Sequence, residues 1–530
     1  MMNIKNTNNN ANTIENLEIQ ISLLKQELAE TQVKLNWYEE QQRLNAERRF
    51  CRSSEKQDHG QLTFFNEAEV TVDSAKEEEK EEPTLEEVTY KRRKKNRSRK
   101  DNLENLPSET IEYKLKDDEK VCECCNGELH EMSKQTKQQL KIIPAQFKVI
   151  NHVQYIYSCR NCEKNDVKAN IKKASMPELV LPGSIASPSA IAYVISQKFV
   201  DSMPLYRLEQ HFARFDLVLS RQTMSNWLLK STEQWLSIIY ESLHQEIVKR
   251  DIIMADETTL QVLKEDDRAP DSKSYMWLYR TGRDGPHIIL YEYQTTRAGK
   301  YPQRYLQNFS GFLCCDGYAG YHKVENVTLI GCWAHARRGF TDALKAMPST
   351  HKDLNVTAKK GLEYCSKLFA IERTLENVSS QERFEERLRQ SKPVLDEFYD
   401  WLKYHKPRVL PKSMLGKAIN YCLNQWNKLI GFLEDGRLEI SNNRAERSIK
   451  PFVISRKNFL FCNTPRGANV SAIAYSIVET AKENNLNPFE YLKYLFNTMP
   501  NVDVNNPEVI KTLLPWSETL PDYCKVSKSK

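Results

Sequence analysis

The sequence lacks an apolar run long enough to cross a membrane. A transmembrane helix needs about 20 consecutive apolar residues, and none of the apolar runs in these 530 residues approaches that length. The N-terminal stretch MMNIKNTNNN is rich in asparagine and lacks the apolar core of a signal peptide. We therefore expect a cytoplasmic protein with no membrane partner.

A strong charge of one sign is also missing. The 77 basic residues nearly balance the 71 acidic ones, which leaves a net charge of +6. Whole-chain electrostatics therefore give no strong argument for nucleic-acid binding, and any basic surface must be local. A disulfide framework is equally unsupported, because the 13 cysteines are odd in number and several, such as Cys314, Cys315 and Cys332, lie in apolar runs. Reduced core thiols suit that pattern better.

Among the features that are present, three acidic residues stand out. Residues 251–262, DIIMADETTLQV, are typical of a strand that carries Asp256. Asp316 follows the apolar run GFLCC, and Glu446 lies in SNNRAERSIKP, a segment that favours a helix start. Two aspartates on strands and one glutamate on a helix form a set of hard oxygen ligands that can hold two Mg²⁺ ions over a scissile phosphate.

Each of these acidic residues has a simpler explanation. A lone strand aspartate is usually solvated or caps a turn. If Asn443 is the N-cap of a helix, Glu446 stands three residues later and becomes a capping-box residue that bonds the backbone. The local pattern alone favours that explanation. Glu257 alternates to the opposite face of the strand from Asp256, so we do not expect it to be a ligand.

The N-terminal segment has apolar residues at heptad spacing. One register position holds Ile14, Ile21, Leu28 and Leu35, and the other holds Leu17, Leu24 and Tyr38. This spacing predicts a coiled coil and a homo-oligomer. An amphipathic helix packed on its own globular domain is the alternative.

Residues 91–100, KRRKKNRSRK, carry eight positive charges in ten residues. Such a block is usually a solvated linker. It can also act as an arm that binds DNA phosphates without sequence specificity, since each neutralised phosphate releases counterions.

Two Cys-x-x-Cys pairs predict a zinc ribbon. Cys122 with Cys125, and Cys159 with Cys162, can together bind one tetrahedral Zn²⁺, and the intervening FKVINHVQYIYSC alternates like a strand hairpin. Paired buried thiols are the alternative. Cys124 lies inside the first pair and could take the place of one ligand.

Residues 179–230 are expected to be helical. SPSAIAYVISQKFV, residues 205–215 and a segment starting at Ser220 give three helices, and Ser220 is a good N-cap. The last two helices predict a helix-turn-helix, with a plain helical hairpin as the alternative. The residues expected on the exposed first turns of the last helix, where they can contact DNA, are Arg221, Gln222, Thr223 and Asn226.

Taken in order, these segments resemble the insertion sequence 66 family of transposases, DDE enzymes with an RNase H-like catalytic core. The resemblance covers nearly the whole chain and rests on RSSEK, SRQTMSNW, ADET, CDGYAGY, GCWAHARR, NNRAERSIKP with SRKNFLF, and LPW. It implies a catalytic triad of Asp256, Asp316 and Glu446, which overrules the capping-box explanation. It also implies structural Zn²⁺ at Cys122, Cys125, Cys159 and Cys162.

The resemblance implies a transposase that binds the ends of a mobile DNA element and catalyses strand cleavage and strand transfer. The triad would hold two Mg²⁺ or Mn²⁺ ions. Basic residues near Glu446 are candidate phosphate contacts: Arg447, Lys450, Arg456 and Lys457. In CWAHARR, Arg337 and Arg338 are placed to contact DNA, and His335 either joins them or is structural. A DNA-binding regulator with an inactive core and a nuclease that cuts without joining are the alternative functions.

We therefore expect a multidomain α/β protein associated with the nucleoid. Its partners would be element ends, target DNA and a second copy of the chain, with companion proteins of the element as further candidates. The expected order is a coiled coil (1–50), a charged linker (51–110), a zinc-binding domain (111–175), a helix-turn-helix-like region (176–245), an RNase H-like core in two parts (246–340 and 436–490) around a helical insertion (341–435), and a C-terminal region (491–530).

The zinc ribbon should depend on metal for its fold, because so short a module has little core of its own. Cys159→Ser should release zinc and weaken DNA binding while leaving the catalytic domain folded. Metal analysis of the purified protein and its variant measures this. A parent protein that contains no zinc would refute the prediction.

Overall fold

The computed structural model describes residues 146–157, 172–346 and 352–526, with scattered residues between 20 and 42. The four predicted zinc ligands, most of the heptad segment and the basic block 91–100 lie outside these residues. The chain divides into two units, residues 1–61 with 177–530 and residues 62–176. In the second unit, β1 (Ile156–Tyr157) pairs with β2 (Lys172–Lys173) in an antiparallel ladder. β1 lies in the alternating segment FKVINHVQYIYSC, and its partner β2 lies after that segment.

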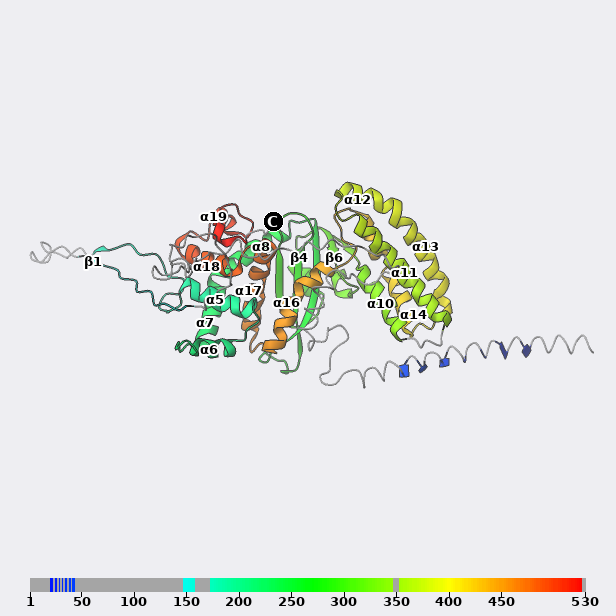
Figure 1. Cartoon of the computed structure of the whole chain (residues 1–530), viewed down its shortest axis with the longest axis horizontal. Helices are drawn as coiled ribbons and strands as arrows, with labels where there is room; N and C mark the ends of the chain where they lie inside the picture. The colour runs from blue at the N-terminus through cyan, green and yellow to red at the C-terminus, as the bar shows by residue number, and fades with distance from the viewer. Residues whose placement is uncertain are drawn as a thin grey trace, which may run out of the picture. The chain divides into compact units, whose positions relative to one another are not determined.

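The larger unit is built on a five-stranded mixed sheet (Figure 1). Its strand order is β5-β4-β3-β6-β7, with β3 antiparallel to β4 and parallel to β6. The strands span Ile252–Gln261 (β3), Lys273–Thr281 (β4), Ile289–Gln294 (β5), Gly311–Cys314 (β6) and Val327–Ile330 (β7). The strand expected over residues 251–262 is confirmed as β3.

The apolar run GFLCC forms β6 only as far as Cys314, and the chain then turns into a 3-10 helix, Ala319–Lys323. Gly317 and Gly320 explain the turn, because a Cβ on Gly320 would lie 2.2 Å from the Tyr318 ring. The turn places Asp316 just beyond the end of β6.

β5 is an edge strand of the sheet, and α17 covers its free edge. α17 (Pro465–Glu483) packs against it. Ser476 accepts from the backbone N–H of Tyr291, and Thr480 both accepts from and donates to the backbone of Ile289. Side chains of the helix therefore replace a sixth strand, which removes an edge that would otherwise pair with other chains.

α16 (Asn443–Phe459) packs against β3 and β4 and is pinned there by a buried arginine. Arg280 on β4 is 1 % exposed. Its guanidinium donates to the Ser448 hydroxyl in α16 and lies 3.3 Å from Glu483 in α17. The position of α16 on the sheet is thus set by a buried, charge-assisted hydrogen bond.

The region before the sheet is helical, as predicted. Its elements are α5 (Pro188–Phe199), α6 (Leu205–Ala213), α7 (Arg221–Ser231), a π-helical turn (Thr232–Leu236) and α8 (Ser237–Ile247). The predicted N-cap of α7 is confirmed, because the Ser220 hydroxyl accepts from the backbone N–H of Thr223. The shorter C-terminal helices α18 (Pro488–Thr498) and α19 (Pro507–Leu513) complete this side, where α18 packs on α5.

A group of helices lies between β7 and α16 in sequence, on the β6 side of the sheet in Figure 1. They are α10 (Trp333–Ala346), α11 (Lys352–Thr374), α12 (Ser380–Glu386), α13 (Lys392–His405), α14 (Met414–Asn424) and α15 (Trp426–Ile430). The expected insertion boundary at 340 falls inside α10. Buried Arg387 holds the return to the sheet by pairing with Glu372 and donating to three backbone carbonyls in the segment before α16.

α9 (Lys300–Tyr305) is a short helix between β5 and β6. None of the helices in the described part of the chain is both long and apolar enough to cross a membrane.

Replacing Arg280 by glutamine should destabilise the fold by about 2 kcal/mol, because the buried hydrogen bonds to charged and polar groups in α16 and α17 are lost. Urea unfolding followed by circular dichroism measures the change. Lys392→Gln is the matched control, since Lys392 pairs with Asp396 on the surface and should cost less than about 0.5 kcal/mol. Equal effects of the two substitutions would contradict the role given to Arg280.

Candidate active site

The three predicted carboxylates come from β3, from the segment after β6 and from α16. Asp256 is the fifth residue of β3, and Asp316 lies two residues beyond the end of β6. Since β3 and β6 are parallel neighbours, with Met254 opposite Cys314, both aspartates lie at corresponding levels of adjacent strands. Glu446 comes from the first turn of α16, which packs on β3.

Electrostatics show that the three groups sense one another. The pKa of Asp256 is raised well above its usual value, first by burial and then by the negative charge of Glu257, with further contributions from Glu446 and Asp316. The structure therefore brings together all three acidic residues singled out in the sequence. The structure thus shows that the three side chains lie close together.

Glu446 does not form the capping box that its local sequence suggested. The N-cap is Asn442, one residue earlier than expected, so Glu446 lies one position too far into the helix for that role. Its Oε1 is buried and has no hydrogen-bond partner among the described residues. Arg338 Nη2 lies 3.7 Å from Glu446 Oε2, and His335 Nδ1 lies 3.8 Å from Oε1.

Asn442 fixes the start of α16, a role that was not predicted from its sequence context. Its Nδ2 donates to the carbonyl of Ala255, next to Asp256, over 2.8 Å. Its backbone N–H donates to Cys332 Sγ over 3.1 Å, at the corner between β7 and α10. Asn442 thus links the helix that carries Glu446 to the strand that carries Asp256.

Glu257 is closer to the site than the alternation rule suggested. Its side chain is 2 % exposed and is bonded by Arg297 and by the hydroxyl of Tyr321. Arg297 Nη2 also lies 3.7 Å from Asp316 Oδ2. One guanidinium therefore contacts both Glu257 and Asp316. Arg297 was not identified from the sequence, where it lies in an ordinary polar turn.

The basic residues of α16 fall into two groups. Arg447 and Lys450 are exposed close to Glu446 on the helix. Arg456 is half-buried and donates to the hydroxyls of Thr258 and Thr259 on β3, over 3.3 Å and 3.1 Å, with no carboxylate partner among the described residues. Lys457 is half-buried beside it.

The CWAHARR residues of α10 point to different neighbours. Arg338 reaches Glu446, as noted, whereas the Arg337 guanidinium lies 5.7 Å from the ring centre of Phe369 in α11. Burial lowers the pKa of His335, so its imidazole is neutral beside Glu446. Of these residues, His335 and Arg338 belong to the acidic site, and Arg337 packs against the inserted helices.

In the helix-turn-helix-like region, the candidate DNA contacts lie on the first two turns of α7. Arg221, Gln222 and Asn226 are exposed, and Gln222 Nε2 donates to Asn226 Oδ1 over 3.2 Å. Thr223 is half-buried at the helix start.

A lysine from the inserted helices adds positive charge near Asp316. The Nζ of Lys428, in α15, lies 2.8 Å from His322 Nε2. Burial lowers the pKa of Lys428, and the nearby Asp316 carboxylate opposes this only in part. Nothing in the local sequence marks Lys428, because more than a hundred residues separate it from Asp316 in the chain.

The donor set fits a hard divalent cation. Asp256, Asp316 and Glu446 offer only oxygens, burial and neighbouring carboxylates raise the pKa of Asp256, and Glu446 Oε1 is a buried acceptor with no partner among the described residues. Cys332 and His335 also have ligand atoms within 4.8 Å of Glu446. However, burial raises the pKa of Cys332 to about 11, so its thiol stays protonated and suits a cation poorly.

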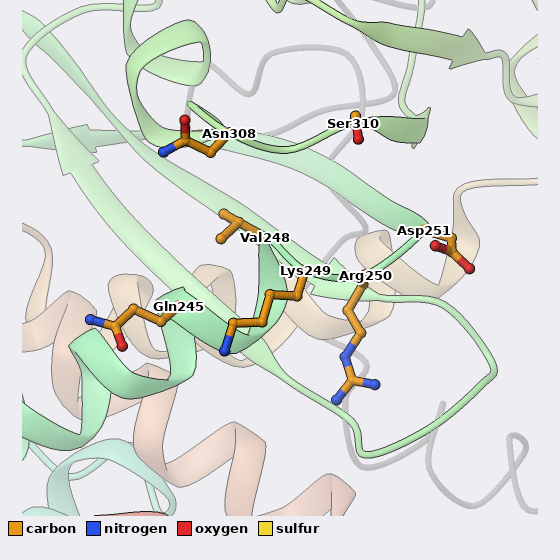
Figure 2. A pocket seen from close by; sticks show the side chains of 7 residues that line it. All are labelled: Gln245, Val248, Lys249, Arg250, Asp251, Asn308 and Ser310. Carbon is orange, nitrogen blue, oxygen red and sulfur yellow. The ribbon is translucent and has the colours of Figure 1, made fainter. Parts of the chain in front are cut away.

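An open pocket of about 640 Å³ lies elsewhere, where α8 ends and β3 and β6 begin (Figure 2). It is lined by Gln245, Val248, Lys249, Arg250, Asp251, Asn308 and Ser310. Since these residues precede the two strands and none of the three carboxylates is among them, this pocket is separate from the acidic site. Fold and site thus define a class: a mixed α/β protein with an all-oxygen acidic site suited to divalent cations.

Comparison with known proteins gives the family. Residues 183–470 match the Transposase IS66 family, and residues 476–516 match the IS66 C-terminal element. Residues 119–163 match the zinc-finger binding domain of transposase IS66, and residues 37–111 match a segment described as Transposase C of IS166 homeodomain. The chain belongs to the Transposase IS66 family, which confirms the resemblance drawn from its motifs.

Curated relatives come from Sinorhizobium fredii (strain NBRC 101917 / NGR234). The chain is 28 % identical to the uncharacterized protein y4jD over 432 residues, covering 78 % of this chain and 82 % of the relative. It is 26 % identical to the uncharacterized protein y4hP over 415 residues, covering 75 % and 73 %. These relatives support the family but carry no stated activity.

The raised pKa of Asp256 gives a pH prediction. An aspartate whose folded pKa exceeds its unfolded value stabilises the fold below the unfolded pKa, and that contribution is lost as pH rises through the folded pKa. The metal-free protein should therefore lose stability with rising pH, and Mg²⁺ should raise its melting temperature more at about pH 8 than at about pH 5.

Asp256→Asn should stabilise the metal-free protein by about 1 kcal/mol, because it removes a buried negative charge, and should abolish most of the Mg²⁺ shift. Thermal melting with and without Mg²⁺ measures both effects. A Mg²⁺ shift that is equal at the two pH values would contradict this account.

Proposed function

We propose that the protein is a DDE transposase that binds the ends of a mobile DNA element and catalyses metal-dependent strand cleavage and strand transfer. The observation that carries the proposal is the convergence of Asp256, Asp316 and Glu446, from two parallel strands and one helix, in a member of the IS66 transposase family. Three antiparallel strands followed by two parallel ones support an RNase H-like core.

In this proposal the three carboxylates hold two Mg²⁺ or Mn²⁺ ions. When bound, such ions increase the nucleophilicity of water or a 3′-hydroxyl and stabilise the departing oxygen. The chain itself fixes the carboxylates before DNA arrives, because Asn442 ties α16 to β3 and Arg280 ties it to β4. No covalent protein intermediate is needed, so one site can serve both hydrolysis and joining.

Positive side chains around the carboxylates would hold the DNA backbone. Arg338 and Lys428 lie near Glu446 and Asp316, and Arg447 and Lys450 are exposed on α16. Arg456 is half-buried with only hydroxyl partners among the described residues, so a phosphate would supply the anion that it lacks.

Other parts of the chain would recognise and pair the ends. The helices α6 and α7 would form a helix-turn-helix that presents Arg221, Gln222 and Asn226. The zinc-finger match contains all four predicted ligand cysteines, which supports a structural Zn²⁺. The N-terminal coiled coil would join two protomers, so that each end of the element meets one active site.

Asp316→Asn and Glu446→Gln should each lower DNA strand cleavage by about a thousandfold or more, since a lost ligand costs several kcal/mol of transition-state stabilisation. Binding of the DNA end should stay within a few fold of the parent. The measurement is Mg²⁺-dependent cleavage of a labelled duplex that carries an element end.

Asp400→Asn is the matched control, because Asp400 is a carboxylate 78 % exposed on α13, and it should cleave like the parent. If Glu446→Gln also cleaves like the parent, the glutamate is not a ligand. Cleavage without joining would favour a nuclease, and a parent that binds DNA but never cleaves it would favour a regulator.

A further inference from the structure

Arg297 lies between two acidic side chains of the site. It leaves the turn after β5 and donates through Nε to Glu257 Oε1 over 2.7 Å, with Nη2 bonding the same oxygen. The same Nη2 lies 3.7 Å from Asp316 Oδ2. A single guanidinium therefore bridges β3 and the segment that follows β6.

Glu257 is buried and fixed in position, so it can hold Arg297 in one orientation. Its carboxylate is 2 % exposed, and a buried carboxylate needs partners that repay its desolvation. The second oxygen, Oε2, accepts from the hydroxyl of Tyr321, whose buried ring meets Trp277 edge to face at 5.8 Å. Because Tyr321 and Trp277 are packed in the core, Glu257 has a fixed position from which to aim Arg297.

Tyr318 also holds Arg297, through its ring and its hydroxyl. The guanidinium lies 3.8 Å from the centre of the Tyr318 ring, and the Tyr318 hydroxyl donates to the backbone carbonyl of Arg297. The backbone N–H of Tyr318 donates to Asp316 Oδ1 over 2.8 Å. Asp316, Tyr318, Arg297 and Glu257 thus form a closed ring of contacts, in which the arginine has lost most of its rotamer freedom before any ligand binds.

One edge of the guanidinium remains available. Nε and Nη2 are used by Glu257, but no hydrogen bond joins Nη1 to the described residues. The Arg297 side chain is 39 % exposed, although its partner is almost fully buried. A guanidinium that is held rigidly with one edge in solvent is suited to donate to a phosphate oxygen.

We propose that Arg297 contacts a non-bridging oxygen of the DNA phosphate beside Asp316, and that Glu257 is the positioning residue that aims it. This inference rests on the proposed function, since it concerns the same substrate. The competing explanation is structural: Arg297 would only neutralise Glu257 and hold Asp316 in place.

The two explanations differ in what happens to divalent cations. Arg297 is a positive charge near a carboxylate that would bind a cation, so removing it should leave cation affinity unchanged or improved. If its role were to hold Asp316 in place, its removal should weaken cation binding instead. Loss of a phosphate contact should appear in DNA affinity.

The main test is the double variant Arg297→Gln with Glu257→Gln, which removes both charges and leaves no buried carboxylate unpaired. DNA affinity is measured by fluorescence anisotropy of a labelled random-sequence duplex in Ca²⁺, which takes the same oxygen ligands as Mg²⁺ with looser geometry. Affinity should fall about tenfold, as expected for one lost hydrogen bond to a charged group. Thermal melting confirms that the variant is folded.

Three single variants complete the test. Arg297→Lys should recover part of the affinity, because it keeps the charge but loses the planar fork. Glu257→Gln should cause a smaller loss than the double variant, since Tyr318 still supports the arginine. Arg304→Gln is the matched control: Arg304 pairs with Glu292 at 3.5 Å, is 66 % exposed, and should bind DNA like the parent. Parent-like affinity of the double variant would overturn the proposal.

Cleavage assays give a second readout. The double variant should cleave slowly even at saturating Mg²⁺, with a half-saturating Mg²⁺ concentration no higher than that of the parent. A raised half-saturation with full rate at high Mg²⁺ would show that Arg297 only positions Asp316, and would overturn the phosphate contact. The Ca²⁺ binding test does not depend on cleavage, so it decides the role of Arg297 even if the parent shows no cleavage and the proposed function fails.

Discussion

Holding three carboxylates close enough to repel one another is the constraint on which the rest of the structure depends. The pKa of Asp256 is raised first by burial and then by the charge of Glu257, and Glu446 and Asp316 raise it further. The fold must therefore supply rigid supports on every side, since carboxylates on flexible segments would simply move apart. β3 and β6 provide two supports and α16 provides the third.

The supports themselves are held by buried polar contacts rather than by apolar packing alone. Asn442 joins the start of α16 to the backbone beside Asp256, and Arg280 joins the middle of the same helix to β4. Arg387 fixes the segment that returns from the inserted helices to α16. Directional buried hydrogen bonds of this kind specify one arrangement, which an apolar core of the same size would specify less sharply.

The inserted helices also contribute to the site. α15 brings Lys428 near Asp316, and the preceding α10 brings Arg338 and His335 near Glu446. The region between β7 and α16 is therefore a source of positive charge beside the carboxylates.

Much of the fold was predictable because its elements are marked locally. The alternation in DIIMADETTLQV and the N-cap at Ser220 each determine structure within a few residues, and both predictions are confirmed. The carboxylates could be selected because each ends an apolar run or starts a helix. From the sequence, only the family motif distinguished Glu446 as a ligand from Glu446 as a capping-box residue. The structure places the N-cap at Asn442, which does not fit a capping box.

The remaining parts of the site could not be predicted because they depend on long-range contacts. Arg297 meets Glu257 across 40 residues, and Asn442 meets Ala255 across 187. Alternation along β3 correctly separated Glu257 from Asp256, but it could not show that Arg297, from the turn after β5, would reach both Glu257 and Asp316. Such contacts are set by sheet order and helix packing, which single-segment patterns do not encode.

The central claim is that Asp256, Asp316 and Glu446 together bind divalent cations. The most direct test is a crystal structure of the protein grown with Mn²⁺, with anomalous scattering recorded at the manganese edge. This account predicts anomalous peaks among these three carboxylates, with oxygens of Glu446 and both aspartates as ligands. Manganese bound elsewhere, with Glu446 turned away from both aspartates, would contradict it.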